Sequence, residues 1–314
     1  MLNRRAIVRT LGAVPLLAAP KVLRAQGATL RILHGSNPGA PQDVMLRLLA
    51  EEWQGIARHP VIVDARPGAS GQVAMAMLKQ LPADGRTVFS DGTGITSILQ
   101  LPTAQHRWTD FEPLYRLQLD PFALYVKQGS HAGLDAFFEA MRKRPGALRI
   151  GGFALGGPHQ IAMLRASRQA GTRFSWIPFD SGARAITAVM GGHLEASMSN
   201  ISVYETFRER TAVLAHTGQD RLERFSEIPT FRESGVNVVA YHWRGMFLRR
   251  GTPDAVTAAL FDQLGAVVRS ERFRAYLRES ATIDGTMPRQ EFAAMLEQQA
   301  TADAEVLREI GLLS

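Results

Sequence analysis

The architecture follows from the stretch TLRILHGSNPGAPQDVMLRLLAEEWQGIARHPVIV, residues 29–63, in which a strand, a loop, a helix and a second strand succeed one another. Residues 29–33 and 61–63 are short β-type runs rich in Leu, Ile and Val. Between them, Asp43 favours a helix N-terminus, and apolar residues recur at helical spacing from Val44 to Trp53. Strand, covering helix and further strand in this order predict a parallel sheet.

The same alternation continues along the chain. We expect further strands over residues 87–90, 122–126, 148–152, 175–178, 194–198 and 238–247. Helices are expected over residues 73–78, 134–144, 158–170, 182–190, 254–269, 271–279 and 288–310. The pattern predicts two α/β blocks, with helices on both faces of a parallel sheet, and a helical C-terminal stretch that folds back on the first block.

The first 25 residues have the features of an export signal. Paired arginines at positions 4 and 5 precede an apolar run at residues 11–19, and small residues follow at an exit around Ala25. The run is about half of the ~20 residues that cross a bilayer, so it is too short for a membrane anchor. Tandem arginines favour the twin-arginine route, with general secretion as the alternative. We expect cleavage after Ala25, with Ala19 as the second choice, and a mature protein in the periplasm.

Charge and composition exclude several classes of protein. The 314 residues carry 36 Lys and Arg against 29 Asp and Glu, a net charge of +7, but five of the cations and no acid lie in residues 1–25. The remainder carries only +2 and has no basic run interleaved with aromatics, so we expect no nucleic-acid binding. There is no cysteine, which excludes cysteine nucleophiles and thiolate metal sites. No later stretch has about 18 consecutive apolar residues, so we expect no membrane insertion.

Four loops stand between the end of an expected strand and the start of an expected helix, at residues 34–41, 91–96, 151–158 and 180–182. In open parallel sheets ligands bind at this edge, where helix N-termini present unpaired N–H groups. Glycines in such loops let the backbone approach a ligand closely, although they can also serve only tight turns. Because amide donors and positive helix ends favour negative charge, the loops predict a site for a small anionic solute.

Motifs for catalysis and for cofactors are missing from the sequence. There is no Gly-x-Ser-x-Gly elbow, His-Glu-x-x-His helix, P-loop or dinucleotide fingerprint, so we expect a non-enzymatic protein without cofactor or metal. His159 opens a helix beside the loop 151–158, where it either packs or contacts a ligand. His242, Trp243 and Arg244 either line an acidic ligand's pocket or form a buried strand with a structural arginine.

Several short motifs follow one another along the chain. Residues 38–47 read Pro-Gly-Ala-Pro-Gln-Asp-Val-Met-Leu-Arg, and residues 65–71 read Ala-Arg-Pro-Gly-Ala-Ser-Gly. Further along, residues 82–87 read Pro-Ala-Asp-Gly-Arg-Thr, residues 151–159 form a glycine-rich loop ending in His, and residues 190–195 read Met-Gly-Gly-His-Leu-Glu. In this order the motifs resemble those of the Bug family of exported solute-binding proteins, the receptors of tripartite tricarboxylate transporters.

The resemblance implies an α/β fold of the periplasmic binding protein type II class, with two Rossmann-like lobes, a hinge and a ligand cleft between them. We assign residues 26–124 and 240–314 to the first lobe and residues 125–239 to the second. It also implies a monomeric receptor that captures a small organic acid or related solute by hinge closure and delivers it to membrane permease subunits. A periplasmic sensing subunit that signals to a receptor kinase would use the same fold and site, and this alternative stays open.

Carried over position by position, the resemblance implies ligand contacts from backbone amides, small hydroxyl residues and ordered waters. The residues expected to bind are Ser36, Asn37, Pro38, Gly39, Ala40, Thr93, Thr96, Gly152, Phe153, Ala154, Leu155, Gly156, Gly157, His159 and Asp180. Asp43 is expected to stabilise its helix instead. Pro41 has no N–H to donate. Citrate-like specificity is not implied, because seven residues depart from the family pattern: Ser36, Asn37, Ala40, Pro41, Ala154, Leu155 and Gly157.

Overall fold

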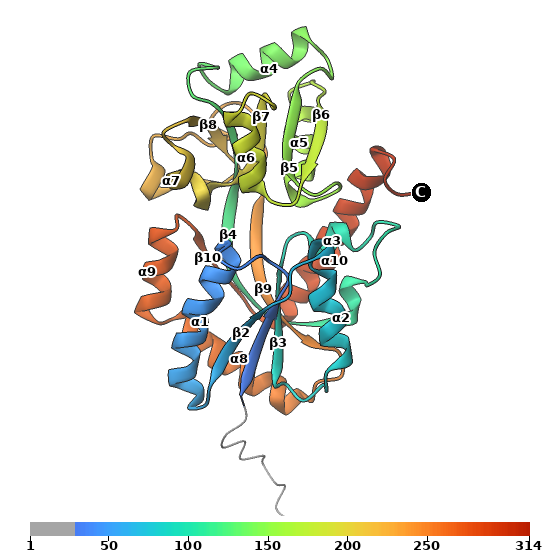
Figure 1. The fold of residues 1–314 in the computed structure, drawn as a ribbon, viewed down its shortest axis with the longest axis vertical. Helices are drawn as coiled ribbons and strands as arrows, with labels where there is room; N and C mark the ends of the chain where they lie inside the picture. Colours follow the sequence, from blue (N-terminus) through green and yellow to red (C-terminus); the bar gives the residue numbers. More distant parts are fainter. Residues whose placement is uncertain (1–28) are drawn as a thin grey trace, which may run out of the picture.

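The computed structural model describes residues 29–314, so the export signal expected at residues 1–25 lies outside the described part. The described residues form two α/β lobes, one above the other in Figure 1. A ten-stranded sheet continues from one lobe to the other in the order β2-β1-β3-β9-β4-β7-β5-β6, and β8 and β10 each pair with β4. The two-lobed α/β fold expected from the sequence is confirmed.

The first lobe begins with the predicted repeat of strand and helix. Its elements are β1 (Leu30–His34), α1 (Pro41–Ala57), β2 (Val61–Ala65), α2 (Gln72–Gln80), β3 (Thr87–Gly92) and the short α3 (Ile95–Ile98). The strands β2, β1 and β3 are parallel, so the loops that follow them meet at one edge, toward the second lobe (Figure 1). α1 buries Met45, Leu49 and Trp53 against this sheet. Val44, the first of the predicted apolar positions, is instead exposed.

The sheet is mixed, which corrects the expectation of a purely parallel one. β9 (Tyr241–Arg249) lies antiparallel between β3 and the long β4 (Phe111–Lys127). We expected only residues 122–126 as strand, whereas β4 begins eleven residues earlier and contains Pro113 and Pro121. Its first part pairs with a segment about 130 residues away, and no local pattern encodes so distant a partner.

The second lobe repeats the parallel arrangement. Its elements are α4 (Leu134–Lys143), β5 (Arg149–Phe153), α5 (Pro158–Gln169), β6 (Ser175–Phe179), α6 (Gly182–Met190), β7 (Ala196–Asn200), α7 (Tyr204–Phe207) and β8 (Thr211–His216). β5 pairs in parallel with β6 and β7, while β7 and β8 pair antiparallel with β4. Most of these strands and helices match the predicted ranges within two residues, but β8 and α7 were not predicted.

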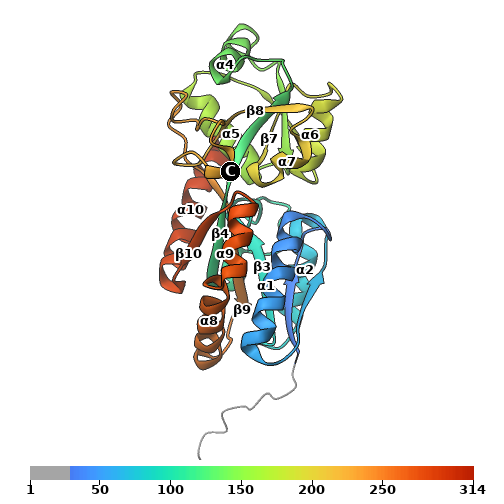
Figure 2. The same cartoon turned by 90° about the vertical axis from the view of Figure 1, so that its left-hand side faces the viewer.

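The C-terminal stretch folds back on the first lobe, as expected. It comprises α8 (Asp254–Val268), α9 (Glu271–Glu279), β10 (Ile283–Met287) and α10 (Arg289–Glu309). α8 packs on α1, and Leu264 shares its core with Leu46. α10 continues to the second lobe (Figure 2), where Asp303 accepts hydrogen bonds from Thr96 Oγ1 at 2.8 Å and from Arg165 Nη2 at 3.4 Å. Thr96 and Arg165 belong to different lobes, so α10 connects the two.

Each lobe has a large hydrophobic core of its own. Leu114 and Leu117 of β4 pack with α1 and α8 in the first lobe, whereas Phe122 and Leu124 pack with α4 and α5 in the second. β4 therefore passes from one core to the other around Asp120. Within residues 29–314, no helix combines the length and the apolar character needed to cross a membrane.

Candidate functional site

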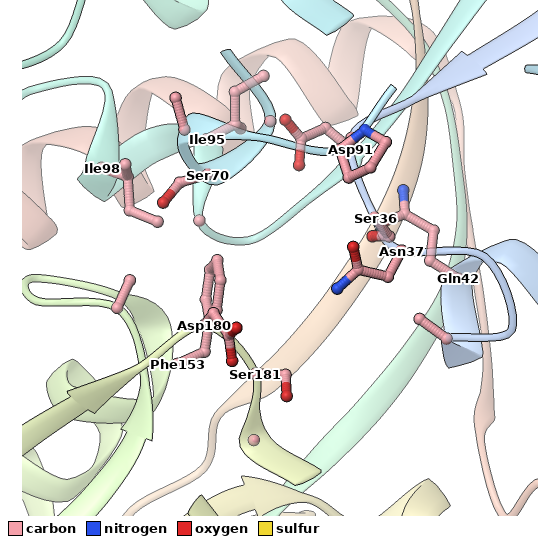
Figure 3. A pocket seen from close by; sticks show the side chains of 18 of the residues that line it. Ser36, Asn37, Gln42, Ser70, Asp91, Ile95, Ile98, Phe153, Asp180 and Ser181 are labelled. Carbon is pink, nitrogen blue, oxygen red and sulfur yellow. The ribbon is translucent and has the colours of Figure 1, made fainter. Parts of the chain in front are cut away.

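A cavity of about 530 Å³ lies between the lobes (Figure 3). The first lobe contributes the loops that follow β1, β2 and β3, and the second lobe contributes the loops that follow β5 and β6 together with the end of β7. Ligand sites in open α/β sheets occur at this edge of the strands, and the volume is that of a typical small-molecule pocket. The sequence-based expectation of a site built from strand-to-helix loops therefore corresponds to a real cavity.

About half of the residues predicted to bind a ligand line this cavity. Those in the lining are Ser36, Asn37, Ala40, Phe153, Ala154, His159 and Asp180. Those outside the lining are Pro38, Gly39, Thr93, Thr96, Gly152, Leu155, Gly156 and Gly157. The second group belongs to the same loops, but several of its members are engaged with other parts of the protein.

The two threonines are tied to neighbouring backbone and to α10. Thr93 Oγ1 donates to the carbonyl of Tyr241 at 3.1 Å and accepts the N–H of Trp243 at 2.8 Å. Thr96 Oγ1 donates to Asp303 at 2.8 Å and is fully buried. These hydroxyls hold the loop after β3 against β9 and α10, so they position the cavity wall without facing the cavity.

The glycine loops are also partly structural. The N–H of Gly39 donates to Asp43 at 2.9 Å, so this aspartate holds the loop before α1 and does not cap a helix N–H. The N–H of Gly156 donates to Gln160 at 2.7 Å. A Cβ at Gly152 would lie 2.6 Å from the carbonyl oxygen of Met198, so this glycine allows close packing of strands. The side chain of Leu155 is 46% exposed and lies outside the cavity.

Residues 67–71, after β2, line the cavity but were not predicted as site residues. Ala69 and Ser70 adopt φ values of 45° and 54°, and in the second lobe Ala154 adopts 58°. Three of the five non-glycine residues with positive φ within residues 29–314 thus line the cavity. Such strain concentrates at functional sites. The strand-to-helix rule that selected the other loops would have found this one as well.

A histidine and an asparagine form a polar contact in the second-lobe wall. The N–H of Phe153 donates to Nδ1 of His159 at 2.9 Å, so Nε2 carries the proton and donates to Asn200 Oδ1 at 3.1 Å. Burial lowers the pKa of His159 to about 4, which leaves the ring neutral near pH 7. Because Asn200 Oδ1 accepts from His159, its Nδ2 is directed as a donor, and it has no hydrogen-bond partner in the described protein.

This contact predicts the protonation state of the ring. In long-range ¹H–¹⁵N NMR spectra at pH 7, His159 is expected as the neutral Nε2–H tautomer, with titration only as the pH approaches 4. Detection of the Nδ1–H tautomer of His159 would contradict the contact with the Phe153 amide.

The carboxylate of Asp91 is another ionisable group of the cavity whose pKa is shifted. Its carboxylate accepts a hydrogen bond from the adjacent Gly92 N–H at 2.7 Å and forms no ion pair within residues 29–314. Burial raises the pKa of Asp91 to about 7. Asp180 lies on the opposite wall (Figure 3) and is paired with Arg184. The two cavity aspartates therefore differ, because only Asp180 has a cationic partner.

Replacing Asp91 with asparagine is expected to stabilise the free protein at high pH. A carboxyl whose pKa is raised on folding favours the folded state when protonated, and that contribution is lost as the pH rises from about 4 to about 7. The gain for Asp91→Asn should therefore be near zero at pH 4 and reach roughly 1–2 kcal/mol at pH 8, after allowance for water in the cleft. Urea denaturation at both pH values measures it. If the stability difference between Asp91→Asn and the wild type did not change with pH, the raised pKa of Asp91 would be contradicted.

Residues 242–244 combine the two interpretations that the sequence left open: one side chain lines the cavity, and the other two are structural. His242 lines the cavity, and burial holds its pKa well below the usual range. Trp243 is buried and donates to Gln299 at 2.8 Å. Arg244 is structural, because it is buried and lies 3.4 Å from Asp120. Within residues 29–314, no group of His, Asp or Glu side chains is placed to hold a metal ion.

Comparison with known proteins finds relatives and solved structures that match this chain over most of its length. The UPF0065 protein in the gbd 5′ region of Cupriavidus necator is 24% identical over 319 residues, covering 98% of this chain and 96% of that protein. The structure of R. palustris Rpa4515 with adipate matches with a TM-score of 0.81 and 22% identity, covering 91% of this chain and 97% of that one. MatC from Rhodopseudomonas palustris with bound malate matches with a TM-score of 0.78 and 19% identity, covering 90% and 99% of the two chains.

At these identities the two solved structures establish the fold. The family assignment rests on the sequence, because residues 45–312 match the model of the tripartite tricarboxylate transporter family receptor. That match begins within α1 and runs past the end of α10, so it includes the cavity loops after β2, β3, β5 and β6 but not the loop after β1. The chain therefore belongs to the tripartite tricarboxylate transporter receptor family of solute-binding proteins.

Proposed function

We propose that the protein is an exported receptor that captures a small carboxylate-bearing solute in the cavity between its lobes. The observation that carries this proposal is the position of three helix N-termini: Ala40, Gly71 and Ser181 each precede a helix and line the cavity. The first N–H groups of a helix lack partners within it, and the positive end of the helix dipole attracts anions. Because these helices belong to both lobes, a carboxylate between them would draw the lobes together.

The adipate and malate bound to two structural relatives are small dicarboxylates. In the present chain, the Nδ2 group of Asn200 adds an unpaired donor to the second-lobe wall. Ile95, Ile98 and Leu99 supply an apolar surface on the first-lobe side. We propose that carboxylate oxygens bind the helix N-termini while the carbon skeleton packs on this apolar surface.

We further propose hinge closure between a first lobe formed by the N-terminal and C-terminal stretches and a second lobe formed by the middle of the chain. The boundary in β4 lies near Asp120 and not at the expected residue 124, because Phe122 and Leu124 pack in the second-lobe core. The change of core within β4 near Asp120 supports a hinge at this place. Closure would exclude water from the cavity and strengthen the charge-assisted hydrogen bonds to the solute. Delivery to membrane permease subunits is the following step, and family membership supports it.

A ligand screen tests the capture step. Thermal unfolding would be followed with mono-, di- and tricarboxylates, amino acids, aromatic acids and neutral amides. A solute that binds only the folded protein adds about 2.7 kcal/mol of stability at a hundredfold excess over Kd. We expect one chemically coherent group of acids to raise Tm, and small-angle scattering to show a smaller radius of gyration with those acids. Absence of binding and of compaction across the panel would refute the receptor function.

A further inference from the structure

The charges that line the cavity do not suit a solute with several carboxylates. The lining residues include Asp91 and Asp180 but no lysine or arginine. The two lining histidines, His159 and His242, both have pKa values lowered by burial and are neutral near pH 7. A dianionic solute would therefore meet two acidic side chains, with only backbone dipoles and neutral donors to balance its charge.

The two aspartates differ in whether a cation of the described protein compensates their negative charge. Asp180 is exposed beside the N-terminus of α6 and is paired with Arg184. Asp91 stands near the end of β3 and accepts a hydrogen bond only from the adjacent Gly92 N–H within residues 29–314. Arg244, which lies one register position from Asp91 on the neighbouring strand β9, is paired with Asp120 instead. Apart from that one N–H, the carboxylate of Asp91 has neither a hydrogen-bond donor nor a cationic partner within residues 29–314.

The surroundings of Asp91 leave room for a ligand group. The Cα of Gly71 faces its carboxylate, and a Cβ at that position would lie 3.7 Å from Asp91 Oδ2. Met75 and Ile95, which also line this part of the cavity, have no charge to offer. Figure 3 shows Asp91 on the same side as Ser36 and Asn37, across the cavity from Asp180 and Ser181. A solute that extends across the cavity could place one end at Asp91 and the other at the N-terminus of α6.

We propose that the captured solute is a zwitterion whose ammonium group binds Asp91 and whose carboxylate binds the amides at the N-terminus of α6. An ammonium supplies both the positive charge and the N–H donors that Asp91 lacks, whereas a second carboxylate there would be repelled. The inference rests on the proposed receptor function and narrows its solute from carboxylates in general to amino acids and ω-amino acids. Asp91 is then the residue that determines specificity.

Matched pairs of compounds test the inference by calorimetry at pH 8, where Asp91 is ionised. The pairs are succinate with aspartate, glutarate with glutamate, and adipate with 6-aminohexanoate. The members of the first two pairs differ by an added amine, and 6-aminohexanoate has an aminomethyl group in place of one carboxylate of adipate. The wild type is expected to bind the amine-bearing member of at least one pair about tenfold more tightly or better. Asp91→Asn, which keeps the shape of the side chain, should abolish that preference while the amine-free member binds equally well or more tightly.

Asp180→Asn is the matched comparison, because it removes the same charge from the opposite wall. It should retain the preference for the amine-bearing member. Equal or tighter binding of the amine-free members by the wild type would overturn the inference and leave the receptor function standing. Loss of the preference in Asp180→Asn but not in Asp91→Asn would also overturn it. Binding of no compound, either here or in the wider screen, would remove the receptor function and the inference with it.

Discussion

Replacing Asp120 with alanine should destabilise the protein by about 3–5 kcal/mol. Asp120 is 0% exposed, and its partner Arg244 is 4% exposed. Arginine stays protonated at any accessible pH, so removal of Asp120 leaves a buried positive charge without compensation. The variant also loses the acceptor for Ser202, whose hydroxyl donates to Asp120 at 2.6 Å. Because Ser202 belongs to the second lobe and Arg244 to β9, the change should weaken the region where β4 passes between the lobes.

The matched variant is Arg244→Met, which removes the other partner. Burial raises the pKa of Asp120, whereas the arginine opposes that shift, so Asp120 can take up a proton once Arg244 is gone. Arg244→Met should therefore cost less than Asp120→Ala, and its cost should decrease as the pH is lowered. Urea denaturation of both variants at pH 5 and pH 8 measures these differences. A cost below about 1 kcal/mol for Asp120→Ala would mean that the pair is not buried as described.

Gly35→Ala should both destabilise the protein and impair solute binding. A Cβ at Gly35 would lie 2.4 Å from the Cα of Gly71, so the loops after β1 and β2 touch through their backbones. Flexible side chains can move away from such a contact, but two backbones cannot do so without displacing the loops. We expect a loss of about 2–3 kcal/mol in stability. Both loops line the cavity, so affinity for the solute should also fall, by about tenfold or more.

Gly55→Ala provides the control for this prediction. Gly55 lies within α1, is exposed, and would have no atom within 4 Å of an added Cβ. The substitution should stabilise the protein by about 0.5–1 kcal/mol, because alanine favours a helix more than glycine does. Its solute affinity should match that of the wild type. If Gly35→Ala is as stable and binds as well as Gly55→Ala, the two cavity loops are not in contact.

Local patterns in the sequence were sufficient for most helices and parallel strands. α6 was predicted at Gly182–Met190, where Ser181 caps the helix by accepting the N–H of Arg184. α9 was likewise predicted at Glu271–Glu279, with Ser270 as its cap. Apolar spacing, capping residues and turn residues act over a few positions, so they can be read from one segment without knowledge of its partners.

The candidate site was predictable as a set of loops but not as a set of side chains. The loops after β1, β3, β5 and β6 all contribute to the cavity, as their place between strand and helix implies. Which side chains face the cavity depends on distant partners. Thr96 is drawn to Asp303, about 200 residues away, and Asn200 enters the wall through its contact with His159.

Short segments of the sequence therefore predict the class of fold and the edge of the sheet where a ligand site is expected, because hydrophobic periodicity and helix capping are local properties. Tertiary structure alone decided that β9 returns antiparallel between β3 and β4 and that Arg244 pairs with Asp120. It also decided that, among residues 29–314, no cation pairs with Asp91. These outcomes depend on which groups meet across long stretches of chain. The energy of a buried charge depends on such neighbours, and no single segment specifies them.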